Sequence, residues 1–338
     1  MARDAFPLAV ALAFGLGTCA VPTDLDAVRT RFDAAPTTGQ DAAASRHAVV
    51  VSQAGPRYLR WVREWHHCAG VMHQRASFAC MLTEAKVLNR TAVVQNDYCM
   101  HKYHTLTASS QSLDSIDRMY NLDEIRLVVG VLLRNGSTHV SKILRSDSTR
   151  RGATLPQPMV SKEVSPHVKT SSLLGDQSTL ITRRFENNYW YDLCGKGPLG
   201  NPELDKTPAH IAVYEKVNTA PHHIATICQR IVKEIEGPFS VVHVRRGDKA
   251  RDKTRWPNLD SDTRGNAILA SPAFNDKVPT NNSVYIATDE RNQGVFSALF
   301  HSRRAFTMAN FTQTIPEIRS LSAYVSFSCF HFQTATWL

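Results

Sequence analysis

Cysteine is scarce in this chain of 338 residues, which contains only seven of them. That proportion excludes a miniature fold held together mainly by disulfides. Glycine and proline, at 16 residues each, are too few for a collagen-like or low-complexity chain, and 43% of the residues are hydrophobic. We therefore expect a folded protein with a substantial core, and the length favours two domains.

Long hydrophobic runs are absent except at the N-terminus. Residues 5–21 are apolar and uncharged, and Thr18 and Ala20 provide small side chains for a cleavage site. This pattern is typical of a secretory signal peptide, which we assign to residues 1–20; a short uncleaved anchor and a buried helix are the alternatives. Residues 21–47 are then expected to form a polar linker.

The cysteines and glycosylation triplets agree with a secreted product. Removal of the signal peptide takes Cys19 with it and leaves six cysteines, an even number consistent with disulfides whose pairing the sequence does not reveal. Four Asn-x-Ser/Thr triplets begin at Asn89, Asn135, Asn281 and Asn310. We expect a location in the ER or Golgi lumen, with membrane contact only through a retained N-terminal anchor.

Acidic residues are outnumbered, with 30 Asp and Glu against 39 Lys and Arg, for a formal net charge of +9. The excess is concentrated in residues 245–255, which hold six basic side chains and two acidic ones. A nucleic-acid-binding protein spreads basic residues over a face with interleaved aromatic residues. The cluster therefore favours a local anion site, or a solvated loop, over a nucleic-acid partner.

Common catalytic and metal-binding signatures are missing as well. The sequence has no G-x-S-x-G or H-E-x-x-H motif, and the G-x-G-x-x-G match at 195–200 contains Pro198 where a helix would have to begin. The histidines near Cys68 and Cys99 lack the paired spacing of a zinc site. Residues 260–262 have the D-x-D spacing of some metal-dependent enzymes, but we interpret them as a polar loop and expect no metal.

Hydrophobic periodicity predicts strands and helices that alternate along the chain. In the first half we expect strands at 48–51 and 58–62, a helix over about 74–88, and strands at 91–94 and 127–133. Residues 146–178, rich in Ser, Thr, Pro and Gly, are expected to be irregular. In the second half we expect a helix of about 17 residues ending near 236, strands at 239–244, 284–288 and 304–308, and a helix around 292–300. The alternation predicts an α/β fold with parallel sheets, whose ligands bind outside the carboxyl ends of the strands.

The basic cluster begins at one such strand end. The two-residue period places His243 and Arg245 on the same side of the strand, and Gly247 permits backbone conformations closed to other residues. Asp289 follows the next predicted strand. Arginine suits a diphosphate because its planar fork donates two charge-assisted hydrogen bonds, and its charge stabilises a departing anion.

Two segments of the second half resemble the donor-binding half of the plant-type protein O-fucosyltransferase family. They are 240–263 (SVVHVRRGDKARDKTRWPNLDSDT) and 284–290 (VYIATDE). Residues 73–94 and 183–194 (RRFENNYWYDLC) are similar to the first helix and strand and to a later segment of that family. The resemblance extends over about residues 58–290.

This resemblance implies a GT-B fold, in which two Rossmann-like domains face a cleft. Residues 48–218 would form the acceptor-side domain and residues 219–338 the donor-binding domain. The implied reaction is inverting, metal-independent transfer of fucose or a related 6-deoxy sugar from a nucleotide diphosphate sugar such as GDP-fucose. The acceptor would be a hydroxyl of a protein or polysaccharide, and no cofactor is required.

The family motif transfers to individual positions. Arg245 matches the arginine that holds the diphosphate and assists its departure, so it is the implied catalytic residue. The implied donor-binding residues are His243, Arg245, Arg246, Gly247, Asp248 and Asp289. Before the first helix, relatives often have Gly-x-x-Asn-Gln, whereas this chain has Gly70, His73 and Gln74, with His73 at the asparagine position.

The end of the chain departs from the family. Residues 316–338 resemble no family segment, and no Asp, Glu, Lys or Arg follows Arg319. The second half accommodates three or four strands, fewer than a complete doubly wound domain needs. We therefore expect a truncated or mis-spliced product with an incomplete donor-binding domain and weak or absent transferase activity; the alternative is a non-catalytic relative that acts as a binding protein or does not fold stably.

Overall fold

The computed structural model describes residues 55–63, 71–100, 112–135, 138–152, 158–185, 194, 203–246 and 249–320. The predicted signal peptide, the linker and the strand expected at 48–51 lie outside these residues, as does the C-terminal run after 320. Within the described ranges, no helix combines the length and the apolar character needed to cross a membrane.

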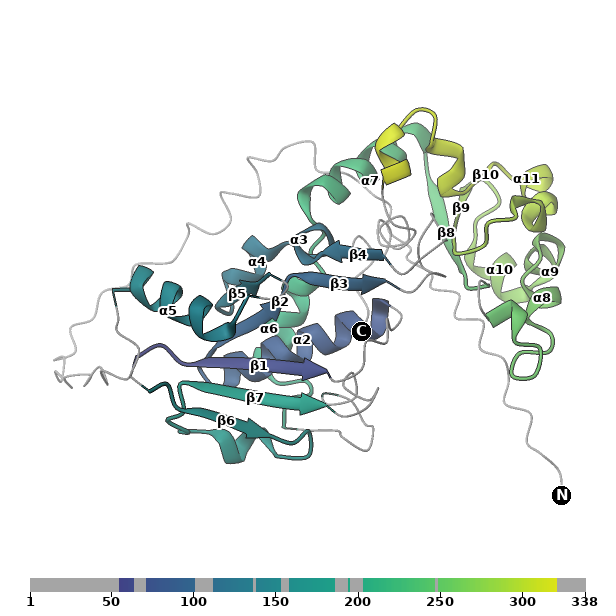
Figure 1. Cartoon of the computed structure of the whole chain (residues 1–338). Coiled ribbons are helices and arrows are strands. Elements are labelled where there is room, and N and C mark those ends of the chain that lie inside the picture. Colours follow the sequence, from purple (N-terminus) through teal and green to yellow (C-terminus); the bar gives the residue numbers. More distant parts are fainter. Residues whose placement is uncertain are drawn as a thin grey trace, which may run out of the picture.

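A five-stranded parallel sheet, in the order β5-β2-β1-β7-β6, organises the first half of the chain (Figure 1). Its strands are β1 (Tyr58–Arg63), β2 (Thr91–Gln95), β5 (Val131–Arg134), β6 (Ser161–Val164) and β7 (Leu180–Phe185). The α/β class with parallel strands is thus as the sequence predicts. The strand expected over 127–133 is shorter and later, because residues 127–130 form a turn in which Leu127 is 73% exposed.

Helices and one hairpin complete this half. The helices are α2 (Val71–Val87), α3 (Ile116–Met119), α4 (Leu122–Arg126), α5 (Val140–Arg150) and α6 (Pro208–Val217). The strands β3 (Asp97–Met100) and β4 (Ser112–Ser115) pair in antiparallel fashion. In α2 the apolar positions Phe78, Leu82 and Ala85 are buried, as their spacing of three and four predicts. The helix ends before Asn89, whose φ of 51° is left-handed.

The expectation that residues 146–178 are irregular is wrong in part. The range includes the end of α5, strand β6 and a 3-10 turn at Thr170–Leu173. Strand β6 lies at the edge of the sheet, and three of its four residues are exposed, so it lacks the apolar alternation of a buried strand. Helix α5 buries only Val140, Leu144 and Ser148, which is a weak periodic signal.

The second half contains a three-stranded parallel sheet in the order β10-β9-β8. Its strands are β8 (Phe239–Val244), β9 (Ser283–Thr288) and β10 (Ala305–Phe306). Its helices are α7 (His222–Ile235), α8 (Leu259–Asp262), α9 (Gly265–Ala270), α10 (Pro272–Lys277) and α11 (Ser297–Ser302). Short 3-10 turns occur at Lys249–Arg251, Gln293–Phe296, Met308–Phe311 and Pro316–Ser320.

The sequence predictions for this half hold closely for its first elements. Helix α7 buries Ile224, Ile227, Ile231 and Ile235 and stops at Glu236 and Gly237, which both have positive φ. Strand β8 has the predicted bounds. The helix expected at 292–300 is instead a 3-10 turn followed by α11, and the third strand has only two residues.

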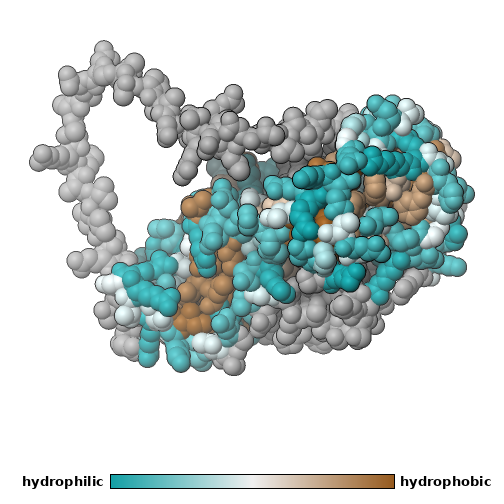
Figure 2. Space-filling view, turned by 90° about the horizontal axis from the view of Figure 1, so that it is seen from above, coloured by the Kyte–Doolittle hydropathy of each residue, from teal (hydrophilic) through white to brown (hydrophobic). Residues whose placement is uncertain are grey.

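The hydrophobic core forms one large cluster and smaller ones. The large cluster includes buried residues of both halves, such as Leu59 and Ile125 in the first and Ile231 and Tyr285 in the second. A smaller cluster lies between the other face of the three-stranded sheet and α9–α11. Seen from above, the described surface is mainly hydrophilic, with an elongated hydrophobic strip on the larger half (Figure 2).

Candidate functional site

The candidate site lies at the carboxyl ends of β8 and β9. The two strands are parallel, with His243 opposite Ala287 and Val244 opposite Thr288, so Arg245 and Asp289 emerge side by side. The Arg245 Nε atom lies 3.2 Å from the Asp289 Oδ2 atom. The Arg245 side chain is 38% exposed and that of Asp289 11% exposed, so the arginine is oriented by a carboxylate yet still meets solvent.

Backbone contacts hold the two strand ends together. The Arg246 N–H donates to Asp289 Oδ1 at 2.7 Å, so the carboxylate contacts both arginines of the pair. The Thr288 hydroxyl donates to the Val244 carbonyl at 2.7 Å and accepts from the Glu290 N–H at 3.0 Å. Because Asp289 and Thr288 tie β9 to β8 at this edge, the orientation of Arg245 is fixed by the sheet.

Arg246 points the other way, since successive residues of a strand face opposite sides. It continues the buried row of Val242 and Val244, and its side chain is 3% exposed. The guanidinium donates to Glu290 at 2.9 Å, to the Asp260 carbonyl at 2.9 Å, and to the Asp260 carboxylate and the Thr263 hydroxyl. It is therefore an internal anchor for the loop after β8, and Arg245 is the arginine of this pair with exposed surface.

The structure describes only one of the three remaining predicted donor-binding residues. His243 is half-buried and shares the face of Arg245, as its spacing predicts. Gly247 and Asp248 lie outside the described residues.

The predicted N-terminal loop residues lie near the start of α2. Gly70 is outside the described part of the chain, and His73 is in the first turn of the helix. Gln74 is only 1% exposed, and the neighbouring Arg75, at 2%, donates from Nη1 to Asn218 at 3.2 Å. The structure thus places Gln74 inside the packed start of α2.

The D-x-D pair is not the polar loop that the sequence indicates, because residues 259–262 form α8. Asp260 is bound by Arg246 and by Arg264, the latter at 2.8 Å, and hydrogen bonds from Arg264 and Arg246 lower the pKa of its carboxyl. Its role here is to hold two guanidinium groups. Within the described ranges, no group of three or more His, Cys, Asp or Glu side chains is arranged to hold a metal.

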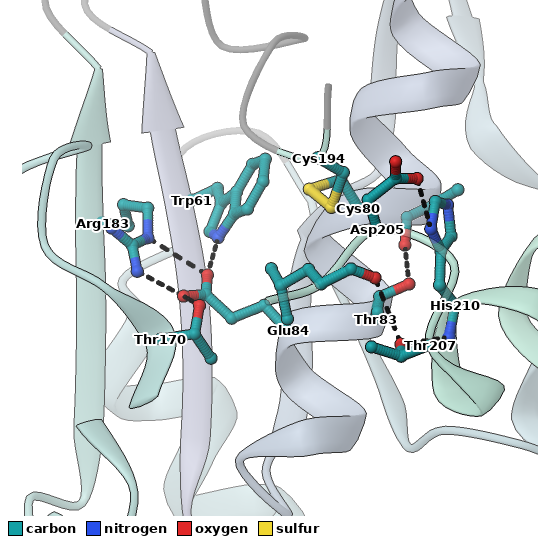
Figure 3. The surroundings of a disulfide bond; sticks show 12 residues. Trp61, Cys80, Thr83, Glu84, Thr170, Arg183, Cys194, Asp205, Thr207 and His210 are labelled. Carbon is teal, nitrogen blue, oxygen red and sulfur yellow. Dashed lines mark hydrogen bonds and ion pairs between the residues drawn. A yellow bond between two sulfur atoms is a disulfide. The ribbon is translucent and has the colours of Figure 1, made fainter. Parts of the chain in front are cut away.

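Sequence reasoning missed a buried ion pair between Glu84 on α2 and Arg183 on β7, both 0% exposed (Figure 3). Glu84 also accepts from the Trp61 indole N–H at 2.7 Å and the Thr170 hydroxyl at 2.9 Å. Arg183 also donates to the carbonyls of residues 165, 166 and 168. Charged residues at apolar positions of α2 and β7 were the only available signal.

A disulfide between Cys80 and Cys194 lies beside this ion pair, with the two Cα atoms 5.6 Å apart (Figure 3). Cys228 is also disulfide-bonded. These bonds agree with the expectation that the cysteines pair.

Comparison with protein-family models, curated proteins and solved structures finds no match to this chain.

Proposed function

We propose that this protein is an O-fucosyltransferase-like glycosyltransferase. It transfers fucose or a related 6-deoxy sugar from a nucleotide diphosphate sugar such as GDP-fucose to a hydroxyl of a protein or polysaccharide. The observation that carries the proposal is the solvent-facing Arg245 at the carboxyl edge of a parallel sheet, oriented by Asp289. Ligands of such sheets bind at this edge.

The chemistry needs a group that accepts negative charge as the donor breaks apart. The acceptor oxygen bonds to the anomeric carbon and passes its proton to water or to the departing diphosphate, while the bond from that carbon to the diphosphate breaks, so the configuration inverts. The diphosphate leaves with the bonding electrons. A guanidinium held at this position binds the growing charge through two hydrogen bonds and stabilises the transition state more than the ground state.

The proposal extends to the arrangement of the whole chain. Two parallel sheets, built from residues 58–185 and 239–306, support a GT-B arrangement, although the second has three strands in the described part of the chain. We place the division between them after 218, between α6 and α7. The Cys80–Cys194 disulfide supports a location in the secretory pathway, because disulfides persist in oxidising compartments.

Donor binding tests the proposal directly. The full-length protein, secreted from a eukaryotic cell, is melted with a panel of nucleotides and nucleotide sugars; a true donor at 100 times its Kd stabilises by about 2.7 kcal/mol. We expect Arg245→Ala and Arg245→Lys both to lose most of this stabilisation and about 100-fold or more in transfer rate, because lysine keeps the charge but not the fork.

Arg255 is the matched control for the arginine test. It belongs to the same basic cluster, and its side chain is 79% exposed. Arg255→Ala should bind the donor as the wild type does. Unchanged donor binding and turnover in a folded Arg245→Ala protein would overturn the assignment.

A second function, binding of a sugar nucleotide without transfer, is favoured by the second sheet. In the described part of the chain this sheet has three strands, whereas a doubly wound domain usually has five or six. A binding protein would show the Arg245-dependent stabilisation but no release of free nucleotide diphosphate with any acceptor.

A further inference from the structure

The face of the five-stranded sheet opposite α2 includes charged residues. Parallel sheets normally have both faces covered by apolar contacts. Here Val140 and Leu144 of α5 cluster with Tyr58 of β1 and Val93 of β2. Arg60 follows Tyr58 on the same face of β1, in register with Val93, where an apolar residue is expected.

Two more arginines share this face. The register pairs Arg60 with Thr182, so Arg184, two residues further along β7, projects from the same side. On the other side of β1, Arg60 pairs with Val93 and Gln95 pairs with Arg134, which places Arg134 of β5 on this face too. We call Arg60, Arg134 and Arg184 the arginine face.

The three arginine side chains differ in the hydrogen bonds and ion pairs that they form. Arg184 forms an ion pair with Glu163 of the edge strand β6, with Nη2 2.9 Å from Oε1. Arg134 donates from Nε to the Thr138 carbonyl at 2.8 Å. Within the described ranges, no hydrogen bond or ion pair engages the half-buried guanidinium of Arg60.

The Arg60 side chain lies among charges of the same sign. Burial lowers the pKa of Arg60, and the nearby charges of Arg134 and Arg184 lower it further, with Glu163 acting in the opposite direction. A group that stays protonated under these conditions brings an electrostatic cost to the folded state. A bound anion between these guanidinium groups would offset that cost.

The position of the arginine face points to a ligand. Strands β1 and β2 lead the chain towards one edge of the sheet, whereas β7 and β6 lie on the other side of β1. Open parallel sheets bind ligands outside the carboxyl ends of their strands. Strands β1 and β7 run in the same direction, and Arg184 lies one residue before the carboxyl end of β7, with Arg60 on the neighbouring strand (Figure 1).

We propose that Arg60, Arg134 and Arg184 form a second anion site, which binds a phosphate dianion. Three guanidinium groups and the Glu163 carboxylate leave a charge of +2, which a phosphomonoester or inorganic phosphate balances at neutral pH. The planar forks match phosphate oxygens. The site goes beyond the transferase proposal, since it uses the first sheet and not Arg245.

Phosphate titration tests this site on the full-length protein. Melting temperature and calorimetric affinity are measured with inorganic phosphate and with glycerol 3-phosphate, at ionic strength matched by sodium chloride. Both anions should stabilise the wild type; tighter binding of glycerol 3-phosphate would assign the site to an organic phosphomonoester, and tighter binding of phosphate to the free ion. Arg60→Gln should weaken both by about tenfold or more.

A structural role for Arg60 predicts a different pattern. If the arginine face binds an anion, Arg60→Gln without phosphate should melt at or above the wild-type temperature, because a repelled charge is gone. Arg60→Lys, which keeps the charge but not the fork, should fold and bind phosphate less tightly than the wild type; it remains informative if the glutamine variant fails to fold. Unchanged phosphate affinity in both variants would overturn the proposal. If Arg60→Gln does not fold, unchanged affinity in Arg60→Lys would overturn it.

Two controls separate the arginine face from other charges. Arg126→Gln removes an exposed arginine of the same half, which pairs with Asp123 three residues away among the described residues, and should leave phosphate affinity unchanged. Arg245→Gln removes the anion site proposed on the second sheet, and the phosphate binding that remains in this variant should still be weakened by Arg60→Gln. If Arg245→Gln abolishes phosphate binding and Arg60→Gln does not, the second site is wrong while the transferase proposal stands.

Discussion

At the scale of the residue, buried charged side chains of this chain differ in whether they have partners. Glu84 and Arg183 are fully buried, and they form an ion pair with each other. Glu84 also accepts hydrogen bonds from Trp61 and Thr170. Such a pair adds little net stability compared with apolar residues, but loss of one partner leaves a buried charge that costs about 3–5 kcal/mol. Among the described residues, no hydrogen bond or ion pair compensates the charge of Arg60, which is why we propose a ligand at Arg60 and none at Arg183.

Asp176 gives a pH-dependent prediction. Burial raises the pKa of its carboxyl, but hydrogen bonds from Lys162 and Ser178 and the Lys162 charge outweigh that effect and lower the pKa from 3.8 to about 2. The carboxylate therefore contributes stability that is fully present above about pH 4 and is lost as the pH falls towards 2. We expect Asp176→Asn to cost about 1 kcal/mol at pH 7 and only a small fraction of that at pH 2.

Urea unfolding at a series of pH values measures this effect. Asp123→Asn is the control, because its carboxylate is 93% exposed and pairs only with a residue three positions away. Its stability difference from the wild type should be negligible at both ends of the range. A cost for Asp176→Asn that stayed constant from pH 7 to pH 2 would show that the carboxylate contributes through packing and not through charge.

The sequence pattern indicates the exposure of one arginine of the candidate site more directly than that of the other. The two-residue period puts His243 and Arg245 on one face, and both side chains are partly exposed in the structure. The same alternation sends Arg246 to the opposite face, but whether that face is open or covered depends on α8 and on the loop that follows β8. Arg246 contacts Asp260 and Thr263, which lie 14 and 17 residues further along the chain. The alternation of residues within one strand gives no information about contacts over such a distance.

At the scale of the element, predictability follows burial. Strand β8 is correct to the residue because it is a short, mainly apolar run that begins directly after the helix-ending Gly237-Pro238; in the structure every second side chain of the strand is buried. Strand β6 was not predicted because three of its four residues are exposed at the sheet edge, so its sequence has no buried apolar pattern. Its extended conformation depends on pairing with β7. Short helices such as α8 and α9 likewise depend on tertiary contacts, because isolated helices of four to six residues are unstable in water.

The Cys80–Cys194 disulfide gives a prediction at this scale. It closes a loop of 114 residues between α2 and the segment after β7, and its sulfur atoms pack in a cluster with Phe185 and Leu204. A crosslink over such a distance restricts the unfolded chain strongly, by about 4–5 kcal/mol in the entropic model. We expect the Cys80→Ala/Cys194→Ala double variant to lose about 2–5 kcal/mol.

Guanidinium unfolding compares this variant with the wild type, with and without a reducing agent. Because Cys228 is also disulfide-bonded, reduction should destabilise the double variant further, but by less than it destabilises the wild type. Equal stability of the double variant and the oxidised wild type would mean that the crosslink does not form in the folded protein.

At the scale of the whole molecule, the two sheets share one core. Helix α7 follows α6 closely in the chain, and buried residues of both helices, Val213 and Val217 in one and Ile224 and Ile227 in the other, belong to the large cluster. The same cluster includes strand residues from β1 and from β9. Neither sheet has a core wholly separate from the other, so we expect the two halves to unfold together.

Scanning calorimetry tests this coupling and the site at once. We expect a single transition, with a calorimetric enthalpy close to the van't Hoff enthalpy, and we expect GDP-fucose bound at Arg245 to move the whole transition upwards. Arg245→Ala should keep the single transition without ligand and lose only the shift. Two transitions, of which the nucleotide sugar moved one, would mean that the contacts within the large cluster are too weak to couple the sheet that contains Arg245 to the sheet that contains Arg60.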